Sequence, residues 1–173
     1  MNVDIDKLVP GQFGVSHGSG LGGEIIRHAT ASWAGHAFIY VGSGMLVEAV
    51  SPATHIAPAN IHDDAIWAYR MPITATQSGM AVARAHALVG RPYDWPAYIG
   101  FTLSILKLAN GQQLDEVFAE DHWRVCSADI VDCYGYAEIP LNFVAAKITP
   151  AGNNINLISP ANLLDLATVN GWV

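Results

Sequence analysis

Charged side chains are scarce in this sequence. Asp, Glu, Lys and Arg together make up 13% of the 173 residues, whereas hydrophobic residues make up 51%. This balance excludes a disordered chain, because disorder needs low hydrophobicity together with high net charge. The chain should therefore fold, and its length predicts a single domain over residues 1–173.

Basic side chains are the scarcer of the two charged kinds. Eight Lys and Arg residues stand against fifteen Asp and Glu residues, which leaves a net charge of -7. No cluster of basic residues occurs along the chain, and binding to a phosphate backbone depends on such clusters. We therefore expect no nucleic-acid partner.

Long apolar runs and targeting signals are missing as well. The first eight residues have neither the basic segment nor the apolar segment of a secretory signal, which predicts a cytoplasmic location and leaves export by another route open. The longest apolar run, residues 98–109, is interrupted by polar side chains and is too short to cross a bilayer. We expect no transmembrane segment.

Only two cysteines are present, Cys126 and Cys133. On the helix that this segment predicts, they would lie about 10 Å apart along the axis, too far for a disulfide. Their spacing also differs from that of structural zinc sites. We therefore expect no disulfide between them, no metal and no other cofactor.

What remains is a pattern of short strands and helices of the α+β class, with a small antiparallel sheet or barrel packed against helices. Strands are predicted at 12–15, 36–41, 45–50 and 65–71. Helices are predicted at 24–29, 77–89, 97–108, 127–136 and 161–169, with a weaker one at 114–120.

The second and third predicted strands form a hairpin around a loop at residues 42–44. If all three loop residues lie outside the strands, His36 and Glu48 point to the same face of the sheet, because side chains alternate with a period of two. A loop of two residues would place them on opposite faces. With the longer loop, Glu48 can orient the imidazole of His36.

Cys126 stands at the start of its predicted helix, with Ile130, Cys133 and Ala137 on the same face. A helix start favours the thiolate form of a cysteine, and a nearby histidine completes a nucleophile. We therefore predict Cys126 as nucleophile, His36 as base and Glu48 as the group that orients the base. Cys133, in mid-helix, is interpreted as a structural residue.

The stretch from His36 to Glu48 resembles the catalytic hairpin of the NlpC/P60 superfamily of papain-like cysteine peptidases. There, a base histidine opens one strand and its polar partner follows twelve residues later. The cysteine follows the hairpin here, which is the order of the circularly permuted branch with YiiX-like and lecithin:retinol acyltransferase-like proteins. The segment 125–131 resembles the YiiX-like cysteine motif, and residues 10–13, 91–95, 149–150 and 159–160 are also similar to that branch.

The resemblance implies a papain-like fold with the catalytic cysteine at a helix N-terminus, and a thiol hydrolase or amidase that cleaves peptide bonds, with peptidoglycan as the suggested substrate. It implies that Tyr93 lines the substrate site. Two alternatives stay open at this point: a lipid acyl hydrolase or acyltransferase, and a non-catalytic binding module on the same fold. The lipid alternative draws support from the apolar helix predicted at 97–108.

Three rival patterns are weaker. His122, four residues before Cys126, is a competing base but more plausibly lies in a surface loop. The glycines of 18–23 match a dinucleotide fingerprint, yet the acidic residue that should follow is missing and a hairpin comes next. The third pattern is a set of potential metal ligands, His55, His62, Asp63 and Asp64. Their spacing matches no standard metal site, so we interpret them as part of a solvated loop.

Overall fold

An open antiparallel sheet of five strands lies at the centre of the computed structural model, which describes residues 5–93, 126–143 and 158–173. The strand order is β4-β3-β2-β1-β5. The strands are β1 (Phe13–Ser16), β2 (His36–Gly42), β3 (Met45–Glu48), β4 (His55–Pro58) and β5 (Ile66–Trp67). The predicted α+β class is confirmed, and of the two predicted forms the sheet is open.

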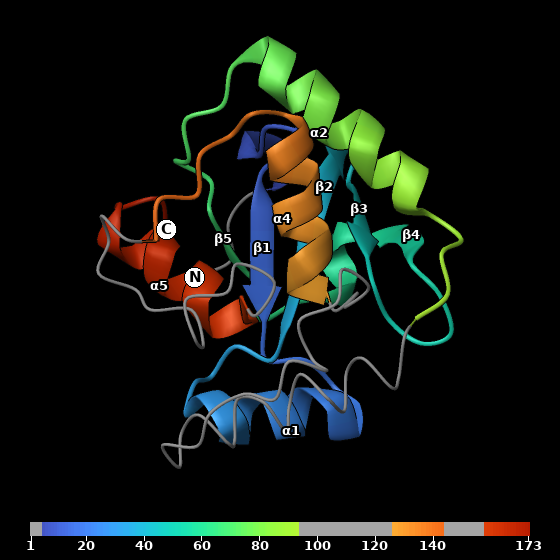
Figure 1. The fold of residues 1–173 in the computed structure, drawn as a ribbon, viewed down its shortest axis with the longest axis vertical. Coiled ribbons are helices and arrows are strands. Elements are labelled where there is room, and N and C mark those ends of the chain that lie inside the picture. The colour runs from blue at the N-terminus through green and yellow to red at the C-terminus, as the bar shows by residue number, and fades with distance from the viewer. Residues whose placement is uncertain (1–4, 94–125, 144–157) are drawn as a thin grey trace, which may run out of the picture.

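Four α-helices accompany the sheet in the described ranges: α1 (Gly20–Thr30), α2 (Ala75–Leu88), α4 (Cys126–Tyr136) and α5 (Pro160–Val169). Two short 3-10 helices also occur, η1 (Ile5–Lys7) and η2 (Ala59–Ile61). Helix α4 packs against β2, α2 packs beside α4, and α1 lies beyond one end of the sheet (Figure 1). Among these residues, no helix is both long and apolar enough to cross a bilayer.

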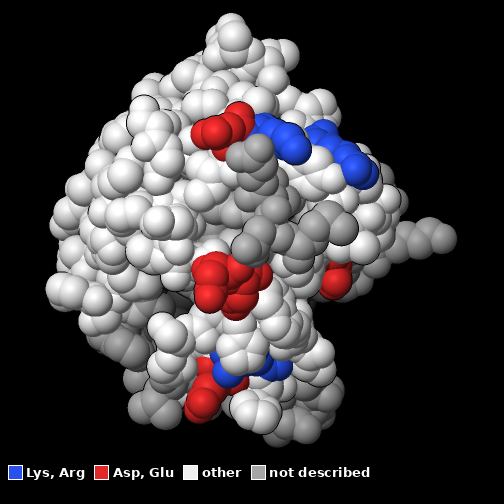
Figure 2. Space-filling model, turned by 180° about the vertical axis from the view of Figure 1, so that it is seen from behind, with Lys and Arg blue, Asp and Glu red and all other residues white. Residues whose placement is uncertain are grey.

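Side chains from the two faces of the sheet pack into two separate apolar clusters. Ala37 and Ile39 of β2 join the larger cluster, together with Cys126, Ile130 and other residues of α4. The alternate residues Phe38 and Tyr40 join a smaller cluster on the opposite face. Seen from behind, the molecule carries a group of acidic side chains near the middle, and acidic and basic side chains lie side by side above and below that group (Figure 2).

Local capping explains where the helices begin. The Thr74 hydroxyl accepts a hydrogen bond from the Gln77 amide, and Ser159 is paired in the same way with Asn162. The predicted helices at 77–89 and 161–169 are therefore confirmed with ends shifted by one or two residues. Helix α1 begins four residues earlier than predicted, inside the glycine-rich segment.

Two strand predictions need correction. Strand β4 was not predicted, because an edge strand of four residues that ends in a proline carries little sequence signal. The strand predicted at 65–71 ends at Trp67. Beyond it, the Ala68 N–H still donates to the carbonyl of Phe13 in β1, and the Gln12 side chain then donates to the carbonyls of Tyr69 and Met71.

Several predicted features lie outside the described residues. They are the helices at 97–108 and 114–120, the rival base His122, and the motif pieces at 94–95, 125 and 149–150.

Candidate active site

His36 and Glu48 meet at one end of the central hairpin. His36 is the first residue of β2, and Glu48 is the last residue of β3. The Nε2 atom of His36 lies 2.7 Å from Oε2 of Glu48, and both side chains are buried. The predicted pair is therefore in hydrogen-bond contact.

The hairpin has a shorter turn than predicted, and a bulge in β2 compensates for it. Only Ser43 and Gly44 form the turn, both with positive φ, as a tight hairpin turn of the I′ type requires. A two-residue turn alone would separate His36 and Glu48 onto opposite faces. One extra residue, Val41, is inserted between the pairs Tyr40↔Leu46 and Gly42↔Met45, and this bulge returns both side chains to one face.

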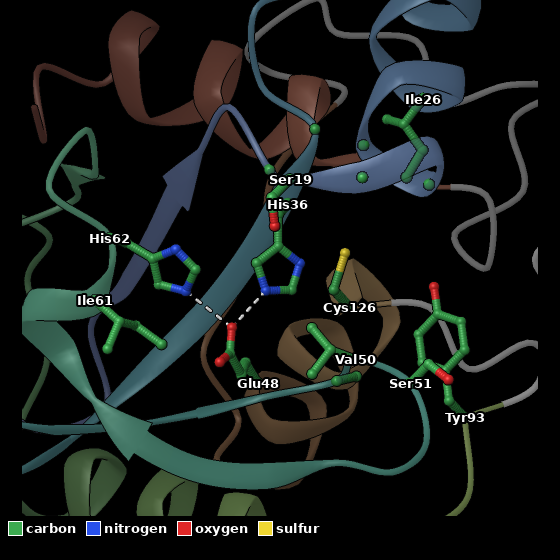
Figure 3. Close-up of a pocket in the computed structure, with 16 residues that line it drawn as sticks. Ser19, Ile26, His36, Glu48, Val50, Ser51, Ile61, His62, Tyr93 and Cys126 are labelled. Carbon is green, nitrogen blue, oxygen red and sulfur yellow. Dashed lines mark hydrogen bonds and ion pairs between the residues drawn. The ribbon is translucent and has the colours of Figure 1, made fainter.

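Cys126 is the first described residue of α4 and is buried next to His36. The imidazole of His36 lies between Glu48 and Cys126, and the ring nitrogen not bound to Glu48 is on the Cys126 side (Figure 3). Burial by itself would lower the pKa of His36. The negative charge of Cys126 and hydrogen bonds with Cys126 and Glu48 outweigh burial and raise that pKa to about 9.

Glu48 is the negative end of this arrangement. Burial alone would raise the pKa of its carboxyl group. Hydrogen bonds from His36 and from His62 have the opposite effect and dominate, so the pKa of Glu48 falls to about 2. Glu48 is therefore a charged acceptor at neutral pH and cannot serve as a proton donor there.

His62 and His55 correct the expectation of a solvated loop. The Nε2 atom of His62 donates to the same Oε2 of Glu48 at 2.9 Å, and the His62 ring stacks on Phe38 with centroids 4.4 Å apart. The Nε2 atom of His55, from the unpredicted strand β4, lies 3.3 Å from the other oxygen, Oε1. Three imidazoles therefore surround one carboxylate, and sequence spacing gave no signal for two of them.

A cavity of about 590 Å³ opens over these side chains. Its wall includes the predicted residues Tyr93, Cys126, His36 and Glu48 (Figure 3). Tyr93 is held by its backbone amide, which donates to the carbonyl of Pro52 at 2.9 Å. The cavity therefore joins the three predicted catalytic side chains to the residue predicted to contact substrate.

The glycine-rich segment forms another wall of the same cavity. Gly18 has a φ of +74°, and a β-carbon there would lie 3.1 Å from Cβ of His36. The strands on either side of α1, β1 and β2, are antiparallel, whereas a dinucleotide fingerprint needs a parallel pair. This geometry argues against the dinucleotide interpretation, and Gly18 instead allows a close approach to His36.

Cys133 lies two turns further along α4 and is fully buried. Burial, together with the charges of Asp129 and Asp132, raises the pKa of its thiol well above the ordinary range. It does not line the cavity that contains Cys126. The structural interpretation of Cys133 agrees with these surroundings.

No family model and no curated protein matches the chain. The described residues offer a thiol, an imidazole with two different partners, and a buried carboxylate beside a cavity. A thiol, a base and an orienting acid in this order can carry out nucleophilic acyl transfer.

Proposed function

We propose that this chain is a cysteine hydrolase of the papain-like type, related to the circularly permuted NlpC/P60 branch, and that it cleaves an amide bond. One observation carries the proposal: the His36 ring lies between Cys126 and Glu48, with Nε2 bound to Glu48 at 2.7 Å (Figure 3). This is the order of nucleophile, base and orienting acid that acyl transfer requires.

The reaction begins with the thiolate of Cys126 and the imidazolium of His36. The sulfur attacks the carbonyl carbon of the substrate, and the oxyanion that forms accepts a hydrogen bond from the Cys126 backbone N–H. His36 then protonates the leaving amine, the carbon–nitrogen bond breaks, and an acyl group remains on sulfur. Water, deprotonated by His36, next attacks this thioester and releases the carboxylic acid.

Glu48 acts on His36 and not on the substrate. Its charged carboxylate fixes which ring nitrogen faces the sulfur and stabilises the imidazolium through their hydrogen bond. The low pKa of Glu48, about 2, keeps this support in place across the neutral range. Tyr93, in the cavity wall, is proposed to contact the substrate.

The sequence resemblance points to peptides of peptidoglycan as the substrate class. The test is incubation with purified peptidoglycan fragments, followed by mass spectrometry for paired products that each carry a new amine or carboxyl end. Cys126→Ala is the control. Its fold should be intact, because loss of one sulfur leaves only a small cavity, and circular dichroism checks this. Cleavage that persists in Cys126→Ala would contradict the proposal.

A parallel incubation with acyl lipids separates the nearest alternative. Release or transfer of a fatty acyl group that depends on Cys126, without cleavage of the peptides, would replace amide hydrolysis by lipid acyl chemistry. No turnover of either class, with Cys126 no more reactive than Cys133, would favour a binding module on the same fold.

A further inference from the structure

Glu48 is in contact with more histidine side chains than acyl transfer requires. A cysteine, one histidine and one acid suffice for that chemistry. Here a second histidine, His62, lies on the same carboxylate oxygen as His36, and the ligand atoms of His36, Glu48 and His62 all lie within 4.8 Å of one another. We propose that these three side chains bind a zinc-type divalent cation, and that the bound cation inhibits the enzyme.

The donor set has the composition that zinc prefers. Two imidazole nitrogens and one carboxylate oxygen leave a fourth tetrahedral position for water, as in sites with three protein ligands. With metal–ligand bonds of about 2.0–2.2 Å, tetrahedral ligand atoms lie about 3.3 Å apart. The two Nε2 atoms lie 2.7 and 2.9 Å from Oε2 of Glu48 and within 4.8 Å of each other, so modest shifts of the side chains bring the three ligand atoms to this spacing.

The surroundings hold these ligands in place. His62 is stacked on Phe38 with an interplanar angle of 6°, and Phe38 pairs with Glu48 across β2 and β3. His55 supports the other oxygen of Glu48 at 3.3 Å, and its Nδ1 donates to the carbonyl of Ala53. Such outer contacts orient metal ligands in known sites.

A cation can reach this site from the open cavity. His36, Glu48 and His62 all line it (Figure 3). The carboxylate of Glu48 supplies a buried oxygen ligand at the wall of that cavity. The thiol of Cys126 does not belong to the three-ligand group. The proposed site is therefore separate from the sulfur atom, which would itself attract a soft metal ion.

Inhibition follows because a metal on one nitrogen of the His36 ring fixes the proton on the other nitrogen. A metal on Nε2 of His36 leaves the ring proton on Nδ1, the nitrogen on the Cys126 side. The ring then cannot accept the proton of the thiol, so Cys126 loses its base while its sulfur stays unbound. This consequence rests on the proposed hydrolase activity, whereas the binding itself does not.

Zinc titration by calorimetry tests the site, with Cys126→Ala as the main protein so that neither the thiol nor turnover is involved. We expect one zinc per chain and an affinity at least equal to that of the unaltered protein, since no thiolate is a ligand. His62→Gln should weaken binding by at least about tenfold. The matched control is His86→Gln, on the exposed surface of α2, which should change nothing.

Cobalt provides a second measurement that needs no variant at His62. Cobalt bound to the unaltered chain should show visible bands of a tetrahedral nitrogen and oxygen site without a thiolate-to-cobalt charge-transfer band. Loss of zinc binding in Cys126→Ala, a charge-transfer band, equal losses in His62→Gln and His86→Gln, or no stoichiometric binding would each overturn the site. Because these measurements use no substrate, they stand or fall separately from the proposed hydrolysis.

Discussion

The Nε2 atom of His36 lies 2.7 Å from Oε2 of Glu48, which stands twelve residues later on the neighbouring strand. This contact fixes the imidazole by one nitrogen and leaves the other on the Cys126 side (Figure 3). It depends on the extra residue at Val41, because a bulge is what brings both side chains to the same face of a hairpin with a two-residue turn.

The order of damage among variants tests the role of Glu48. His36→Ala removes the base and should lower kcat/KM by at least about a thousandfold. Glu48→Gln should cost less, about ten- to a hundredfold, since the amide oxygen still accepts from Nε2 and the charge of Cys126 still supports the imidazolium. Steady-state kinetics on both variants measures this, and a Glu48→Gln enzyme as impaired as His36→Ala contradicts an orienting role.

The low pKa of Glu48 predicts how stability depends on pH. The pKa is about 2 in the folded chain against an ordinary value of 4.5, so the ionised carboxylate stabilises the fold above pH 4.5. This contribution, on the order of 3 kcal/mol, is lost as the pH falls from 4.5 towards 2.

Urea unfolding of the unaltered chain and of Glu48→Gln, in buffer with a chelator, checks this pH dependence. The difference between their free energies of unfolding should be largest near pH 6 and should shrink below pH 4.5. A difference that stays constant over this range would show that Glu48 gains nothing from ionisation in the fold.

Gly14 on β1 tests the packing that supports His62. A β-carbon at Gly14 would overlap the ring of Phe38 and lie 2.8 Å from that of Trp67, and Phe38 is the ring on which His62 stacks. Gly14→Ala should therefore destabilise the chain by about 1–3 kcal/mol. Gly79→Ala is the control, because that helical position is open and alanine should stabilise it by about 0.5–1 kcal/mol.

Thermal unfolding of both variants gives the answer. A melting temperature of Gly14→Ala equal to that of the unaltered chain would mean that the two rings can move aside freely, and that His62 is held less firmly than the stacking suggests.

The sequence was informative where the signals were local. The offset between His36 and Glu48 on a hairpin, and the place of Cys126 ahead of a helical apolar pattern, indicated that the three would lie close together. The three-residue loop on which the shared face of His36 and Glu48 depended was wrong, and the bulge at Val41 supplies that shared face instead. Both signals depend on short stretches of chain. Strands β1, β2 and β3 were predicted to within two residues at each end for the same reason.

What the sequence did not reveal depends on contacts between distant segments. The bulge at Val41 has no signal in the amino-acid composition. His62 reaches Glu48 only because η2 follows the edge strand β4 and because the His62 ring packs on Phe38. No spacing rule relates His62 to a strand two elements earlier. The chain geometry had to be known before three imidazoles could be placed on one carboxylate.

The most direct test of the central claim is the rate at which each cysteine is alkylated by iodoacetamide at pH 7, with the modified residue located by mass spectrometry. Cys126 should react at least about tenfold faster than Cys133, which burial keeps in its thiol form. His36→Ala should slow the labelling of Cys126 and leave that of Cys133 unchanged. Equal rates at the two cysteines, or a Cys126 rate that His36→Ala does not change, would contradict a thiolate activated by His36.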